Sequence, residues 1–157
     1  MKIRKLALAL SLLGLIGCQK QVPIEEDTGL KQRAIEAARA YVQAIKTQDL
    51  DFVVQQSVFP YWLDRDVVDA EGLKRMLAEE AEDLARWQLK QLRFFTEADI
   101  SIFAPRMIER LKAENLAHTY FVVAQFTDSS EQNRRPEAVL FVLQFEQGQW
   151  KFTGLED

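Results

Sequence analysis

The stretch AVLFVLQFEQGQWKFTGL, residues 138–155, decides the fold because it contains two strands and the turn between them. Residues 138–145 are almost wholly apolar, as expected of a strand that is covered on both faces. Gln147 and Gly148 follow as a turn, and residues 149–155 return as the closing strand. The stretch therefore predicts an antiparallel hairpin at the end of a larger sheet.

Three further segments upstream have strand patterns. Residues 118–127 precede a polar loop at 128–136, which predicts another hairpin. Residues 93–103 alternate with a period of two, as a half-buried strand does. Residues 57–63 combine aromatic and β-branched side chains, and Pro60 places an edge or a bulge within them.

Helical periodicity dominates the first half of the chain. Apolar residues recur at helical spacing over residues 28–47, and Thr28 can cap this helix. Asp49 can cap a second, shorter helix. Asp69 can cap a long one, whose apolar stripe runs to Trp87 or Gln88. Helices followed by a meander of strands predict an α+β domain.

Three stretches of the chain resemble the NTF2-like superfamily, the SnoaL and ketosteroid-isomerase-like proteins. They are AARAYVQAIKTQD (37–49), EGLKRML (71–77) and FEQGQWKFTG (145–154). The resemblance implies a cone over residues 29–157, with N-terminal helices packed on a curved, mostly antiparallel sheet. A short helix predicted over residues 107–115, after Pro105, departs from the plainest members of the family.

The N-terminal segment has the order of a bacterial export signal. A positively charged start is followed by an apolar run at residues 6–16, which is too short to cross about 30 Å of hydrocarbon as a stable helix. The end of this run resembles a lipobox, with Leu15, Gly17 and Cys18 at the matching positions. The alternative is an ordinary secretory signal that happens to contain a cysteine.

The lipobox resemblance implies a signal peptide over residues 1–17 and a lipidated tether over residues 18–28. Cys18 would carry the lipid and anchor the protein to a membrane. Gln19, where an aspartate would favour the inner membrane, favours the outer membrane. We therefore expect a lipoprotein of the cell envelope that faces the periplasm.

Charge and composition restrict the function. The chain carries 20 Lys+Arg and 24 Asp+Glu, a net charge of −4, and loss of Lys2, Arg4 and Lys5 with the signal gives −4 − 3 = −7. Nucleic-acid binding is therefore not expected, because its proteins usually present a basic patch. Cys18 is the only cysteine and His118 the only histidine, which excludes a disulfide and a zinc site of nitrogen and sulfur ligands. We predict no metal and no other cofactor.

The side chains available for acid–base chemistry are few. An isomerase-type site on this fold needs a carboxylate base and hydrogen-bond donors in a dry cavity, and Tyr41, Tyr61, Asp64 and Asp66 are the available parts. Asp64, Arg65 and Asp66 also resemble hydrolases of this fold that pair Asp with Arg. The simpler interpretation is a charged strand end or loop, because charged residues are seldom buried.

Two other polar features have equally ordinary interpretations. His118 begins a strand, where an edge residue is commoner than a general base. Glu79, Glu80, Glu82 and Asp83 occupy neighbouring helical positions that do not converge on one point, so a solvated face is favoured over a cation site. Without a convincing base, the sequence favours a non-enzymatic domain over an isomerase, dehydratase or hydrolase.

Large aromatic side chains predict a ligand site. Tyr41, Phe59, Trp62 and Trp87 are the bulkiest residues of the segments expected to face the concave side of the sheet. Such residues either line a cone or fill it, and the sequence leaves both open. A lined cavity of about 300–1,000 Å³ would hold a small, mostly apolar ligand. A filled one leaves binding of an envelope protein or a structural role.

The strand at residues 138–145 also bears on assembly. Val139 and Phe141 point to one face of the sheet, and Leu140 and Val142 point to the other. Helices can cover only the inner face, so the outer face needs cover from a second subunit or from the chain's own tail. The family resemblance implies that many such domains pair through this surface, so we predict a homodimer.

Overall fold

The computed structural model describes residues 24–63, 66–103, 105, 108–109, 119–128 and 137–156. The predicted signal and lipidation site, Asp64, Arg65, His118, the polar loop and most of the short helix predicted after Pro105 lie outside the described residues.

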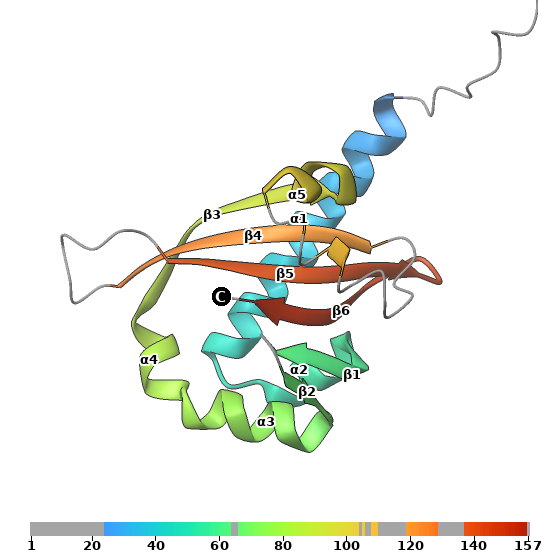
Figure 1. Ribbon diagram of the computed structural model, residues 1–157. Helices are drawn as coiled ribbons and strands as arrows, with labels where there is room; N and C mark the ends of the chain where they lie inside the picture. Colours follow the sequence, from blue (N-terminus) through green and yellow to red (C-terminus); the bar gives the residue numbers. More distant parts are fainter. Residues whose placement is uncertain are drawn as a thin grey trace, which may run out of the picture.

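Helices and strands follow one another along the chain, and Figure 1 shows their arrangement. The helices are α1 (Ile24–Lys46), α2 (Leu50–Gln56), α3 (Ala70–Glu79), α4 (Ala81–Arg86) and α5 (Glu97–Phe103). The strands are β1 (Ser57–Leu63), β2 (Asp66–Val68), β3 (Trp87–Thr96), β4 (Thr119–Asp128), β5 (Glu137–Glu146) and β6 (Gln149–Glu156).

The six strands form one curved sheet in the order β2-β1-β6-β5-β4-β3. Neighbouring strands are antiparallel except β1 and β6, which are parallel. Helix α1 lies across one face of this sheet, and α2, α3 and α4 lie near the C-terminal end of α1 (Figure 1). The predicted α+β class and the mostly antiparallel sheet are confirmed.

The closing hairpin forms as its sequence predicts. Gln147 and Gly148 have φ angles of 50° and 81°, and Phe145 pairs with Trp150 across the turn. Two successive positive φ angles define the tight turn whose twist suits a two-residue hairpin. The strand at residues 119–128 pairs with β5 over most of its length, as expected.

Strand β1 contains the predicted irregularity at Pro60. Ser57 pairs with Phe152 and Trp62 with Gly154, so the register of β1 against β6 shifts between the two pairs. Pro60 lies between these two pairs. Regular hydrogen bonding between β1 and β6 is interrupted there, so the N–H that proline lacks is not needed. The shift brings the Gly154 backbone against Trp62: an ideal Cβ on Gly154 would lie 2.8 Å from the Trp62 Cβ.

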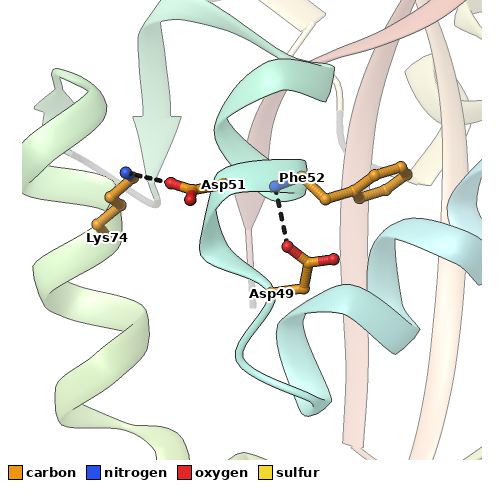
Figure 2. Close-up of polar contacts among 4 residues, drawn as sticks. All are labelled: Asp49, Asp51, Phe52 and Lys74. Atoms are coloured by element: carbon orange, nitrogen blue, oxygen red, sulfur yellow. Dashed lines mark hydrogen bonds and ion pairs between the residues drawn. The ribbon is translucent and has the colours of Figure 1, made fainter.

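The two predicted aspartate caps are confirmed. The Asp49 carboxylate accepts a hydrogen bond from the Phe52 N–H at 3.2 Å, and the Asp69 carboxylate accepts one from the Gly72 N–H at 2.7 Å. Figure 2 shows the first cap and the neighbouring ion pair of Asp51 with Lys74, 2.6 Å long, which joins α2 to α3. This pair is largely exposed, so it orients the two helices more than it stabilises them.

The predicted long helix is wrong beyond residue 79. A turn at Glu80 separates α3 from the short α4, and Trp87 begins β3 instead of continuing the helix. Glu79 lies three and four positions before Glu82 and Asp83 in sequence, a spacing at which like charges repel on a continuous helix. Because the helix breaks at Glu80, these carboxylates no longer share one face of a continuous helix.

The predicted strand over residues 93–103 is wrong beyond Thr96, where α5 begins. The Asp99 carboxylate accepts hydrogen bonds from the Thr96 N–H at 2.8 Å and from the Thr96 hydroxyl at 2.7 Å. The Asp99 N–H donates to the Thr96 hydroxyl at 3.4 Å. This reciprocal arrangement is a capping box, and it starts a helix where the alternation of apolar residues predicted a strand.

Helix α1 begins at Ile24, before the predicted start at Thr28. Its first residues include Glu25, Glu26 and Asp27. Acidic side chains are favourable near a helix N-terminus because they complement the helix dipole. The apolar periodicity of residues 28–47 does not extend to residues 24–27, so it did not predict this first turn.

Two apolar clusters cover the two faces of the sheet. The larger lies between the sheet and helices α1 to α3 and includes Tyr41, Phe141 and Phe152. The smaller lies on the outer face and contains Ile100, Ile108, Phe121 and Val142, with Trp62, Phe95 and Leu140 partly buried against it. The chain's own α5 segment thus covers part of the face for which the sequence predicted a second subunit.

Candidate functional site

The centre of the cone is filled by aromatic side chains. Tyr41 reaches in from α1 and is 1% exposed. Its ring stacks on Phe152 of β6 with centroids 3.9 Å apart and meets the edge of Phe141 at 5.9 Å. Three rings in mutual contact occupy the space where a ligand would lie in an open cone, so Tyr41 fills the interior rather than lining a cavity.

A short chain of hydroxyl groups is buried beside these rings. The Tyr41 Oη lies 2.7 Å from the Ser57 Oγ, and the Ser57 hydroxyl donates to the Val53 carbonyl at 2.8 Å. Because a serine has only one proton to donate, Tyr41 is the donor to Ser57. The buried Tyr61 hydroxyl lies beside that of Tyr41, but within the part of the chain that the structure describes it has no partner with hydrogen-bond geometry.

Burial dominates the acidity of both tyrosines. It raises the pKa of Tyr41 to about 12, against the smaller opposing effect of the hydrogen bond with Ser57. Burial also raises the pKa of Tyr61 well above its ordinary value, and the neighbouring Tyr41 raises it further. Both groups are therefore neutral at physiological pH and serve as hydrogen-bonding groups rather than bases.

Removing each hydroxyl in turn separates its contribution to stability. We expect Tyr41→Phe to lower the free energy of unfolding by about 1 kcal/mol, because it removes a buried hydrogen bond. We expect Tyr61→Phe to be neutral or stabilising, because it removes a buried hydroxyl without a partner. Urea denaturation of both variants measures the difference. A larger loss for Tyr61→Phe than for Tyr41→Phe would contradict this hydrogen-bond assignment.

The raised tyrosine pKa predicts alkaline destabilisation. The unfolded chain releases the Tyr41 proton near pH 10, whereas the folded state holds it to about pH 12. This contribution is complete below pH 10 and is lost as the pH rises from 10 towards 12. Denaturation midpoints measured from pH 8 to 12 should fall most steeply above pH 10, and less steeply in Tyr41→Phe. Equal slopes would contradict the assignment to Tyr41.

No described carboxylate joins the tyrosines in the interior. The buried polar residues of the described chain are Thr119 and Thr153 apart from the tyrosine and tryptophan side chains. Asp66 is exposed on β2, and Asp64 lies outside the described residues. The structure therefore does not bring Asp66 together with Tyr41 and Tyr61 as an isomerase-type site requires.

The four residues predicted to line a pocket do not come together. Tyr41 lies in the filled centre, while Phe59 and Trp87 are partly buried against the same large cluster. Trp62 packs on the outer cluster instead. Its neighbour Tyr61 takes the inner position, because successive residues of a strand point to opposite faces.

A small apolar hollow lies near the C-terminal end of α1 and has a volume of about 50 Å³. We call it the Trp87 hollow. It is lined by Val42, Ile45, Lys46, Leu77, Leu84, Trp87, Phe126, Val139, Phe141 and Leu155. Trp87 is the only one of the four predicted pocket residues that lines it. Lys46 was not predicted as a site residue. Its place beside the apolar positions Val42 and Ile45 of the same helix was a usable signal for it.

A second, broader groove of about 610 Å³ runs between β1, β2 and the start of α3. It is lined by Phe59, Pro60, Val67, Val68, Asp69, Gly72 and Arg75. Asp69 is already used as a helix cap. The groove mixes exposed charged and apolar side chains and lacks the enclosed apolar surface that holds a small ligand.

The described residues contain neither a metal-binding cluster nor a membrane-spanning helix. Within the described ranges, no group of three or more His, Cys, Asp or Glu side chains has an arrangement that could hold a metal ion. No helix of the described chain is both long enough and apolar enough to cross a membrane.

A six-stranded mixed sheet with helices packed on its curved face is the α+β fold that NTF2-like and cystatin-like proteins share. No protein-family model matches the chain, and no curated protein matches it. Solved structures do match, at low sequence identity, and they show the fold alone.

Three of these structures illustrate the likeness. A protein of unknown function with a cystatin-like fold from Nostoc punctiforme has a TM-score of 0.52 at 10% identity, covering 80% of this chain and 86% of its own. An NTF2-like protein with a cystatin-like fold from Novosphingobium aromaticivorans has a TM-score of 0.53 at 8% identity, covering 89% and 90%. A proposed dehydratase from the NTF2-like family of Streptomyces avermitilis has a TM-score of 0.50 at 12% identity, covering 83% and 95%.

Proposed function

We propose that this protein is a lipid-anchored protein of the cell envelope whose NTF2-like domain binds a small apolar ligand in the Trp87 hollow without transforming it. The observation that carries the proposal is the combination of an aromatic-filled cone and an adjoining apolar hollow, which share Phe141. Neither contains a described carboxylate, so there is a place for an apolar group and no described base beside it.

The size of the hollow determines how a ligand enters. A volume of about 50 Å³ is well below the ~300 Å³ at which pockets begin to enclose a drug-sized molecule. The hollow therefore takes the tip of a narrow chain unless one of its walls moves. This favours an unbranched apolar group over a fused-ring ligand.

Helix α4 is the wall that can move most easily. None of its residues is buried, and its N-cap residue Glu80 makes no side-chain capping bond. Leu84 is its contribution to the hollow. Local opening is easiest where few apolar contacts are buried, so displacement of α4 would enlarge the hollow at low free-energy cost.

The proposed anchor places this site near a bilayer. Cys18 and Ile24 are 24 − 18 = 6 residues apart, which allows about 20 Å at full extension. A lipidated Cys18 would therefore keep the domain close to the membrane surface, where single-chain apolar molecules are abundant. The outer membrane remains our proposal from Gln19, with the domain on the periplasmic side.

Metabolic labelling with palmitate tests the anchor. We expect the wild-type chain to become labelled and Cys18→Ala to remain unlabelled. The matched control is a double variant, Cys18→Ala with Gln21→Cys, which keeps one cysteine but moves it out of the lipobox. This control should also remain unlabelled. An unlabelled wild type, or equal labelling of the control, would contradict lipidation at Cys18.

A further inference from the structure

The Trp87 hollow has one charged residue at its edge. Lys46 is the last residue of α1 and is half-buried, whereas the remaining lining side chains are apolar. Its ammonium group makes no hydrogen bond and no ion pair within the described ranges. A lysine in such a place packs its methylene stem against apolar surface and keeps its ammonium group in water, where the group is free to pair with an anion.

Polar side chains at the end of α1 and on α4 already have partners of their own. The Gln48 side-chain amide donates to the Ile45 carbonyl at 3.0 Å and to the Leu77 carbonyl at 3.2 Å. These bonds fix the end of α1 against α3. On α4, Arg86 pairs with Asp83, so that carboxylate is engaged as well.

From this arrangement we infer that the hollow binds a single-chain amphipathic anion, whose apolar end enters beside Trp87 and whose carboxylate or phosphate pairs with Lys46. The inference rests on the proposed function and specifies its ligand class. An uncharged apolar ligand would leave the Lys46 ammonium group unpaired. An anionic head group supplies the missing partner and forms a charge-assisted hydrogen bond.

The dimensions agree with this class of ligand. The hollow accepts only the end of a chain in its present form, and Lys46 is the one charged residue among those that line it. A fatty acid has the matching order of groups, an apolar tail followed by one terminal charge. A single-chain phosphate monoester has the same order, so both belong to the inferred class.

Photo-crosslinking in native membranes tests the inference with the full chain. The probes are octanoate, octyl phosphate and octanol, each with a diazirine at the methyl end, and the labelled peptides are mapped by mass spectrometry. We expect both anions to label peptides that contain Leu84 or Trp87. Octanol should label them about tenfold less, because hydrogen bonds to charged groups are the stronger ones.

Two variants assign the effect to Lys46. Lys46→Met should reduce labelling by the anions to the level of octanol. Arg39→Met removes an exposed cation from the same helix and should change nothing. Equal labelling by octanol and the anions, or anion labelling that Lys46→Met does not reduce, would overturn the anion inference and leave apolar binding intact. No labelling of the hollow by any probe would overturn both proposals.

Discussion

Replacing Gly154 with alanine is expected to lower the free energy of unfolding by about 3 kcal/mol. An ideal Cβ at this position would lie 2.8 Å from the Trp62 Cβ and 3.0 Å from the Trp62 carbonyl oxygen. The second contact is with backbone, so it is relieved only by moving β1 away from β6. Overpacking that forces backbone shifts costs about 1–3 kcal/mol, occasionally more, and the tightness of this contact places it at the upper end.

Gly29→Ala is the matched control for this substitution. Gly29 is exposed in α1, and its added Cβ would meet no atom within 4 Å. We expect a gain of up to about 1 kcal/mol, because alanine favours the helix more than glycine does. Urea denaturation of both variants gives the comparison. A Gly154→Ala protein as stable as the wild type would contradict the close approach of β6 to Trp62.

Truncation of Tyr41 to alanine is expected to cost about 3–5 kcal/mol of stability, as for other large buried aromatic residues. The ring is fully buried, stacks on Phe152 and touches the edge of Phe141. Its removal leaves a cavity in the largest apolar cluster. The size of the loss distinguishes a ring that fills the cone from one that lines an open pocket.

Phe59→Ala is the control for that truncation. Phe59 is only partly buried and lines the broad groove, so the loss should be about 1–2 kcal/mol. Thermal or urea denaturation measures both variants. If Tyr41→Ala cost no more than Phe59→Ala, the cone would be a lined cavity, and a central ligand site would replace the Trp87 hollow.

The part of the fold that sequence analysis predicted is the part where local signals agree. The Gln147–Gly148 turn lies between two apolar strands, and Asp49 and Asp69 stand just before helical patterns. The structure uses each signal in the predicted way. In these segments turn chemistry, capping and hydrophobic period all favour the same structure.

The errors arose where two local signals compete. Thr96 and Asp99 have the spacing of a capping box, but they lie within a segment whose apolar residues alternate as in a strand. The capping box prevails, and Ile100 then reaches the outer cluster from α5. A period-two pattern of this length does not exclude a helix when a cap occurs inside it.

The candidate site was predictable only in part. Trp87 was identified for its size, but its expected place on a helix was wrong, and as the first residue of β3 it lines a different space. Trp62 was assigned to the inner face, because the residue types do not show which of Tyr61 and Trp62 points inward once the strand is irregular at Pro60. The place of Lys46 beside Val42 and Ile45 is visible in the sequence, but the apolar residues that other elements bring to the hollow are not.

Native mass spectrometry of the protein isolated from the cell envelope tests most directly whether the domain binds an apolar molecule and leaves it unchanged. We predict a complex heavier than the lipidated chain by one small amphiphile, which is released chemically unchanged on denaturation and whose occupancy is reduced in Lys46→Met. A protein that carries no such molecule and takes up none when incubated with fatty acids, or one that releases them chemically altered, would contradict it.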